Sequence, residues 1–348
     1  QANGVYVGSG SQAVRVGTGN AGNVISSNAG AGIFVQGSAT FTTIIQGNVI
    51  GMASNLITIR GNANEGIKIL NSSDNTIIGG DNNANEHNLI SGNVGIGIRL
   101  QNSTNTTISG NVIGLNGPMT AAAPNTAQRI YISNSSATLI GGTASGTGNV
   151  ISGNGTVGVF MLNGVDDVTF FGNVIGLDGA GTNAFGNGNN GIYANNVTNL
   201  TLGGNSAATR NYISGNGSDG ISMTGGGVNG GTIQGNIIGL GTDGNTIFAN
   251  TGSGIYADAT SNVNIGGNGT NEGNVISGNG TNGIFFGALC DSNTIAGNII
   301  GENESLTAVR SNSQKGIYLN SSATSNTIGG LTAEDGNRVV GNGEDGIL

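Results

Sequence analysis

An asparagine that returns at regular intervals is the feature that most limits what this chain can fold into. A six-residue segment, Asn-Val-Ile-Ser-Gly-Asn in its commonest form, recurs every 61–65 residues, and its copies begin at Asn23, Asn88, Asn149, Asn211, Asn274 and Asn337. Second copies of the type Gly-Asn-x-Ile-Gly lie between them, at Asn48, Asn111, Asn173, Asn236 and Asn298. Successive asparagines are therefore alternately 23–25 and 38–40 residues apart. A fixed period of this length predicts a solenoid in which each repeat forms one coil.

Each coil carries three short apolar pieces in a constant order. The first is Asn-x-Ile, the second is Gly-Ile-x-x and the third is x-Thr-Ile, and each alternates apolar and other residues. Alternation with period two is typical of strands with one buried face. Coils that stack at the roughly 4.8 Å spacing of neighbouring strands then form three parallel sheets. The sequence predicts an all-β, right-handed parallel β-helix over residues 1–348, with about eleven coils of three short strands and alternating short and long coils.

The composition agrees with this fold and excludes two other classes. The chain has 69 Gly, 2 Pro and 8% charged residues, whereas 36% of its residues are hydrophobic. Disorder requires few apolar residues and a high charge, and collagen requires a glycine at every third position with abundant proline. A net charge of −9 with nine dispersed basic residues excludes a nucleic-acid partner. No apolar stretch approaches the roughly 18 residues that a membrane helix needs.

The recurring asparagine has a structural role in such a fold. Its amide has two donors and one acceptor, so stacked copies can bond to one another along the axis. We expect one ladder that contains all eleven asparagines of the repeat, from Asn23 to Asn337. A second ladder is expected at the next corner, with Asn93, Asn154, Asn216, Asn279 and Asn342. Long coils carry one insertion after the first strand and another after the third, which predicts two rows of loops roughly 10 Å apart.

The order Asn-Val-Ile-Ser-Gly-Asn, Gly-Ile, Thr-Ile-x-Gly-Asn-x-Ile-Gly-Leu, Gly-Ile, Thr-Ile-Gly-Gly resembles that of secreted bacterial proteins with pectate-lyase-like β-helix repeats. The resemblance covers nearly the whole chain. It implies an extracellular or cell-surface location, often within a longer protein. It implies no particular activity, because the superfamily contains lyases, hydrolases, epimerases and non-catalytic adhesins.

Residues with catalytic or metal-binding chemistry are sparse. The carboxylates just before the third strand, Asp74, the pair Asp166–Asp167, and Asp291, fall three or four coils apart, too far for joint catalysis. Adjacent residues of a strand face opposite sides, so Asp166 and Asp167 are expected to point apart. The basic residues are too dispersed for a lyase-like cluster: Arg99, Arg129, Arg210, Arg310 and Lys315.

Three other polar features are interpreted as structural. His87, the only histidine, is expected to be a solvated turn residue, and Cys290, the only cysteine, a small buried apolar residue. Four loop carboxylates leave calcium as a minor alternative to a protein without any cofactor or metal, namely Asp178, Asp243, Glu302 and Glu304. A column of outward threonines is attributed to β-propensity rather than ice binding: Thr107, Thr138, Thr169, Thr201, Thr232, Thr294 and Thr327.

One surface feature departs from chance. The outward residue of the second strand is aromatic in eight of eleven coils. Coil by coil the column is Tyr6, Phe34, Lys68, Arg99, Tyr131, Phe160, Tyr193, Ser222, Tyr256, Phe285 and Tyr318. Stacked rings stabilise a sheet modestly, and an apolar stripe of this length also marks a contact surface for sugars, another solenoid or the chain's own loops. The candidate partner- or glycan-binding residues are Tyr131, Phe160, Tyr193, Tyr256, Phe285 and Tyr318.

The leading functional expectation is a non-catalytic, extracellular structural protein, an adhesin stalk or a filament subunit. Neither end of the solenoid carries a polar cap, so the chain is expected to be a segment of a longer protein or to self-associate end to end or laterally. The alternative is a carbohydrate-active enzyme, a polysaccharide lyase or hydrolase, or a glycan-binding β-helix, with a polysaccharide partner.

Overall fold

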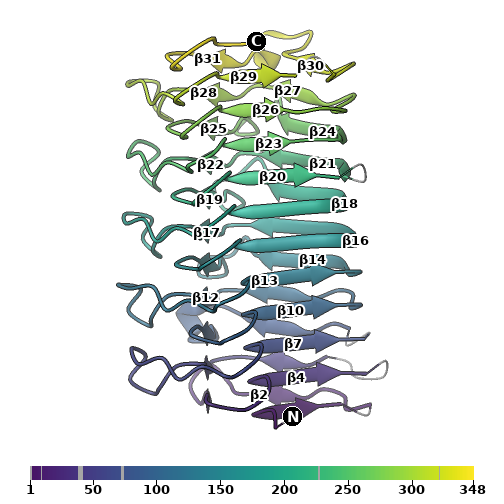
Figure 1. Ribbon diagram of the computed structural model, residues 1–348, viewed down its shortest axis with the longest axis vertical. Helices are drawn as coiled ribbons and strands as arrows, with labels where there is room; N and C mark the ends of the chain where they lie inside the picture. Colours follow the sequence, from purple (N-terminus) through teal and green to yellow (C-terminus); the bar gives the residue numbers. More distant parts are fainter. Residues whose placement is uncertain (1, 9, 38–41, 72–73, 226–227, 321) are drawn as a thin grey trace.

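The computed structural model describes residues 2–8, 10–37, 42–71, 74–225, 228–320 and 322–348. These residues form a right-handed parallel β-helix whose coils stack from the N-terminal to the C-terminal end (Figure 1). Each strand pairs in parallel with its equivalents in the coils before and after it, as β1 does with β4 and β4 with β7. The predicted fold class is confirmed.

Three faces run along the solenoid. The first face contains β1 (Val5–Val7), β4 (Ile33–Gln36), β7 (Ile67–Leu70), β10 (Ile98–Gln101), β13 (Ile130–Ser133), β16 (Val159–Phe171), β18 (Ile192–Gly203), β20 (Ile221–Thr224), β23 (Ile255–Ala257), β26 (Ile284–Phe286) and β29 (Ile317–Leu319). The second face contains β2 (Arg15–Val16), β5 (Ile44–Ile45), β8 (Ile77–Gly79), β11 (Thr107–Ser109), β14 (Ser136–Gly141), β21 (Val228–Gln234), β24 (Thr260–Gly266), β27 (Thr294–Ala296) and β30 (Thr327–Ile328). β16 and β18 turn the corner without a break and belong to both faces.

The third face is a separate sheet of eleven two-residue strands. They are β3 (Val24–Ile25), β6 (Val49–Ile50), β9 (Leu89–Ile90), β12 (Val112–Ile113), β15 (Val150–Ile151), β17 (Val174–Ile175), β19 (Tyr212–Ile213), β22 (Ile237–Ile238), β25 (Val275–Ile276), β28 (Ile299–Ile300) and β31 (Arg338–Val339). Two single turns of 3₁₀ helix, η1 (Asn82–Ala84) and η2 (Ala333–Asp335), lie in loops that precede this face.

The core consists of columns of one residue type that repeat from coil to coil. Ile33, Ile67, Ile98 and Ile130 stack in register on the first face and are fully buried. Full burial of such a side chain is worth about 1.5–3 kcal/mol. The period-two pattern thus supplies an apolar interior in which every coil packs on its neighbours.

The predicted asparagine ladder is continuous. Each asparagine from Asn23 to Asn298 donates its Nδ2 to the Oδ1 of the next one, over ten steps with N···O distances of 2.9–3.2 Å. The amide also closes the turn, as when Asn88 Nδ2 donates to the Ile45 carbonyl at 2.8 Å. The ladder therefore joins successive coils and satisfies backbone groups at one corner.

A second ladder lies at the next corner. It contains the five asparagines predicted for it and also asparagines from the long coils. It joins Asn28, Asn62, Asn93 and Asn125, and then Asn154, Asn187, Asn216, Asn250, Asn279, Asn312 and Asn342. The two parts are not bonded to each other, because Asn154 Oδ1 is buried without a partner.

Arg129 explains this interruption. In the other coils the residue before the first-face strand is glycine, and a Cβ at Gly66, for example, would lie 2.9 Å from the ladder nitrogen of Asn93. Arg129 occupies the equivalent position next to Asn154, is fully buried, and has no hydrogen-bond partner for any guanidinium nitrogen. Burial lowers the pKa of this guanidinium to about 9.

The alternating long coils are also confirmed. Five hairpin loops, residues 52–59, 115–122, 177–184, 240–247 and 302–309, follow every second strand of the third face, and each contains an antiparallel bridge. Neighbouring loops touch, as when Glu304 N donates to the Gly244 carbonyl at 3.0 Å. The serine of the repeat anchors a loop base: Ser214 Oγ donates to the Leu240 carbonyl at 2.7 Å and accepts from Gly239 N at 3.0 Å. These loops project to one side of the solenoid in Figure 1.

Two details of the sequence predictions are wrong. Thr138 is buried, and Leu139 takes the outward position that pairs with Thr107 and Thr169. Asp166 and Asp167 do not point apart, because Asp167 has a left-handed backbone with a φ of 53° that keeps both carboxylates outside the corner. A tight corner breaks the strand alternation on which both predictions were based.

Candidate functional site

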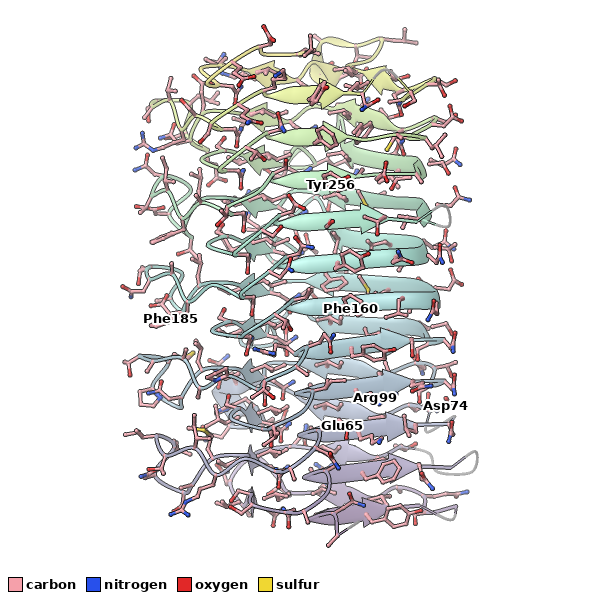
Figure 2. The ribbon with its side chains drawn as sticks, viewed as in Figure 1. Glu65, Asp74, Arg99, Phe160, Phe185 and Tyr256 are labelled. Atoms are coloured by element: carbon pink, nitrogen blue, oxygen red, sulfur yellow. The ribbon has the colours of Figure 1, made fainter. Side chains whose placement is uncertain are left out.

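The aromatic column predicted from the sequence forms one stripe along the first face. Its eleven residues pair in register from Tyr6 to Tyr318 without a slip. Except for Ser222, which is buried, these side chains are partly exposed. Phe160 and Tyr256 in Figure 2 show how the rings lie on the outside of this sheet. The loop rows lie over the third face and leave the stripe open.

The rings stack as an ordered series. Phe160 and Tyr193 are parallel, with centroids 5.0 Å apart and an interplanar angle of 7°. Tyr256 and Phe285 repeat this geometry at 5.1 Å and 10°. Thr224 Oγ1 donates to the Tyr193 hydroxyl at 2.8 Å, which fixes the tip of that ring. Such contacts stabilise the sheet by about 0.5–1.5 kcal/mol each, and the stacked side chains remain partly exposed.

A charged centre interrupts the aromatic series at β7 and β10. Lys68 Nζ lies 3.5 Å and Arg99 Nη1 lies 3.4 Å from the same oxygen, Oε1 of Glu65. The Lys68 and Arg99 side chains are 23% and 31% exposed, whereas that of Glu65 is 11% exposed. Two cations share one anion, so the centre carries a net positive charge in a chain whose overall charge is −9. Figure 2 shows Glu65 and Arg99 side by side on the first face.

Aromatic rings border this centre on both sides. Lys68 Nζ lies 5.2 Å from the centroid of Phe34, and Arg99 Cζ lies 5.4 Å from the centroid of Tyr131. Arg99 Nη2 donates to Gln101 Oε1 at 2.7 Å, which orients the guanidinium. Cation–π contacts of this kind hold both cations in line with the stripe.

The sequence predicted Arg99 to be one of five dispersed basic residues and Lys68 to be a member of the outward column, and it did not predict that they share one carboxylate. Their order in the outward column already places them on consecutive coils, and the structure pairs them through Glu65. Glu65 itself is missed by the sequence prediction, because it lies in the turn before β7, outside the alternating strand pattern. A column-by-column search for charge in the turns reveals it.

The corner carboxylates lie elsewhere and have structural partners. Asp74 Oδ1 accepts from Thr104 N at 2.9 Å, and Asp291 Oδ1 accepts from Thr324 Oγ1 at 2.9 Å. The hydrogen bonds from Thr324 and Ser292 lower the pKa of Asp291. In Figure 2 Asp74 and Glu65 lie at opposite edges of the first face. The strand between them, from Glu65 to Leu70, spans roughly 16 Å at 3.3 Å per residue.

The loop carboxylates are likewise engaged within the chain. Asp178 Oδ1 accepts from Thr182 N at 2.8 Å, and Asp243 Oδ1 accepts from Thr246 N at 2.8 Å, so both close their own hairpins. Glu302 pairs with Arg338, and Glu304 Oε1 lies 2.5 Å from Arg210 Nη1. In the described ranges no group of three His, Cys, Asp or Glu residues is placed to hold a metal ion.

The prediction for Cys290 is confirmed and the prediction for His87 is wrong. Cys290 is fully buried in the corner between β26 and β27, as predicted, and burial raises its pKa. His87 is not a solvated turn residue: its Nδ1 is buried without a partner, and burial lowers its pKa. It borders a cavity of about 220 Å³ between the loops of the third face, with Val49, Leu56 and Leu89.

The geometry of the charged centre limits its chemistry. Hydrolysis of a sugar polymer by two carboxylates requires a separation of about 5–9.5 Å. Glu65 is held by both cations, and its neighbour on the same coil, Asp74, is too distant. Two cations beside a phenol can instead neutralise a substrate carboxylate while a proton leaves the adjacent carbon.

Within the described residues, no helix is long and apolar enough to cross a membrane. No protein-family model and no curated protein sequence matches the chain. Solved structures with a similar fold include the periplasmic alginate epimerase AlgG (13% identity, TM-score 0.42, covering 91% of this chain and 70% of that one). Two A-modules of Azotobacter vinelandii mannuronan C-5 epimerases also match: AlgE6 (14%, 0.45, 99% and 82%) and AlgE4 (13%, 0.39, 97% and 88%).

At these identities the likeness describes the fold. The matching structures are enzymes whose names refer to a polysaccharide or its epimerisation, so the expectation of a protein without enzymatic activity finds no support among them. The non-catalytic adhesin type of the resemblance is not supported. What the chain shares with these proteins is the right-handed parallel β-helix.

Proposed function

We propose that this protein is a carbohydrate-active enzyme that binds an acidic polysaccharide along the stripe and removes a proton next to a uronate carboxylate. The observation that carries the proposal is the pair of cations, Lys68 and Arg99, held by one glutamate in line with aromatic rings. Sugar rings stack on aromatic faces, and a carboxylate is bound by convergent cations. The proposed substrate is an extracellular or periplasmic polysaccharide, so we propose the same location for the protein.

The roles of the residues follow from their contacts. Lys68 and Arg99 bind the uronate carboxylate and stabilise the negative charge that develops on it. Glu65 is occupied by both cations, so we assign removal of the proton to the side-chain oxygen of Tyr131, the ring beside Arg99, which accepts it as a phenolate and becomes a phenol. Return of a proton from water to the opposite face gives an epimer, whereas expulsion of the substituent on the next carbon, which leaves with the proton that Tyr131 holds, gives an unsaturated product. Both outcomes share the first step.

Substitutions at the centre test this proposal. Lys68→Gln and Arg99→Gln remove the positive charge, so binding of a polyuronate and its turnover are both expected to fall, the turnover by about 10²-fold or more. Tyr131→Phe keeps the stacking ring and removes the hydroxyl. It is expected to retain binding and lose turnover by about 10²–10⁴-fold.

The matched control is Arg60→Gln, which removes a cation from an exposed loop position outside the stripe. It is expected to leave both binding and turnover unchanged. The measurements are calorimetric binding, and detection of unsaturated ends and of epimerised residues by NMR. Equal losses in Arg60→Gln and Arg99→Gln, or full activity of all three centre variants, contradict the proposal.

A further inference from the structure

Ser222 divides the stripe into two aromatic platforms. The near platform is Tyr131, Phe160 and Tyr193, next to the charged centre, and the far platform is Tyr256, Phe285 and Tyr318. Ser222 lies in register between them and is buried, so no ring bridges the gap. Arg99 and Tyr256 are five coils apart, roughly 24 Å at one strand spacing per coil. A sugar dimer or trimer cannot reach from the charged centre to the far platform, whereas a polymer can.

The far platform and the charged centre differ in the sign of the charges around them. Two carboxylates border the far platform: Asp258, two residues after Tyr256 on the same outward side, and Asp219. Asp219 Oδ1 accepts from the backbone nitrogen of Ser253 at 2.8 Å, three residues before Tyr256. Burial raises the pKa of Tyr256, and the negative charges of Asp258 and Asp219 raise it further.

The cation on the far platform does not offset these carboxylates. Lys315 lies over Tyr318, with Nζ 5.3 Å from the ring centroid, and it pairs with Glu344. The pair is neutral as a unit. The far platform thus combines partly exposed rings with negative surrounding charge, whereas the charged centre lies between rings and carries a net positive charge.

We infer that the stripe selects a polysaccharide that carries uronate and uncharged sugars on the same chain. The uronate occupies Lys68 and Arg99, and uncharged residues stack on Tyr256, Phe285 and Tyr318. This inference rests on the proposed function and narrows its substrate class. Stacking does not require charge, but a second carboxylate near Asp219 and Asp258 is repelled. Two contacts on one chain reinforce each other, because binding at the first raises the effective concentration of the second.

The test compares three polymers of matched length at low ionic strength by calorimetry: a homopolyuronate, a copolymer of uronate and neutral hexose, and a neutral hexose polymer. The copolymer is expected to bind at least about tenfold more tightly than the homopolyuronate. The neutral polymer is expected to bind most weakly, because it lacks a carboxylate for the charged centre.

Two sets of variants locate the effect. The double variant Asp219→Asn with Asp258→Asn is expected to reduce the difference in binding affinity between the copolymer and the homopolyuronate. The control for net charge is Asp74→Asn with Asp291→Asn, which removes two carboxylates from the corner. Tyr256→Ser with Tyr318→Ser is expected to remove the advantage of the copolymer while binding of a uronate trimer stays unchanged. Serine at Ser222 shows that the column accommodates this side chain.

The outcomes separate the inference from the proposed function. If the homopolyuronate binds as tightly as the copolymer, the inference is overturned while the proposed function stands. If neither uronate polymer binds, both are overturned. If Asp74→Asn with Asp291→Asn reduces the affinity difference between the two polymers as much as Asp219→Asn with Asp258→Asn does, the effect is due to net charge and the inference fails.

Discussion

At the scale of single residues, Arg129 is a buried side chain whose polar atoms lack partners. It stands where other coils have glycine, its three guanidinium nitrogens are buried without partners, and it interrupts the second ladder at Asn154. A buried charge without a partner costs several kcal/mol. Arg129→Gly removes this cost and makes room for the bond between Asn125 and Asn154.

We therefore expect Arg129→Gly to raise the free energy of unfolding at pH 7 by on the order of 3–5 kcal/mol. The folded pKa of about 9 lies below the ordinary value for arginine, so the unfolded state binds more protons above pH 9. The stability of the natural chain is accordingly expected to rise with pH above about 9, and that of Arg129→Gly is not. Guanidinium unfolding at pH 7 and pH 10 measures both, and a destabilised Arg129→Gly contradicts the account of this residue.

At the scale of structural elements, the asparagine ladder joins the coils as much as the sheets do. Asn173 receives an N–H from Asn149 at 2.9 Å, donates to Asn211 at 2.9 Å, and donates to the Ile140 carbonyl at 2.9 Å. Removing its side chain takes the Oδ1 acceptor from Asn149 N and Nδ2 and the Nδ2 donor from the Ile140 carbonyl, and each buried group left without a partner costs about 1–3 kcal/mol.

Asn173→Ala is expected to lower the free energy of unfolding by about 3 kcal/mol or more. The control is Asn205→Ala, an exposed asparagine in the loop 204–211, which is expected to change stability by less than about 0.5 kcal/mol. Denaturant midpoints compare the two variants. Equal midpoints for Asn173→Ala and the natural chain show that the ladder adds nothing to stability.

At the scale of the whole molecule, the features that repeat were predictable from the sequence and the features that occur once were not. The period of the asparagines and the alternation of Ile and Val determine the coils, both ladders, the loops in every second coil and the register of the stripe. Self-association stays a prediction.

The errors occur where a residue acts outside the repeat. Thr138 and Asp167 lie at corners, where a left-handed or irregular backbone changes which side a residue faces. Glu65 lies in a turn, and its role depends on two side chains from two coils. Strand periodicity carries no information about such contacts, so the charged centre was not predicted and a carbohydrate-active enzyme was only the alternative function.

The central claim is that Lys68, Arg99 and Tyr131 promote removal of the proton next to a uronate carboxylate. The most direct measurement is incubation of a uronate-containing polysaccharide with the protein in D₂O, followed by NMR of that carbon position. We expect deuterium incorporation or elimination at the position with the natural chain and with Arg60→Gln, and none with Arg99→Gln. A polymer that keeps its protons and its bonds in the presence of the natural chain, although it binds, contradicts the account.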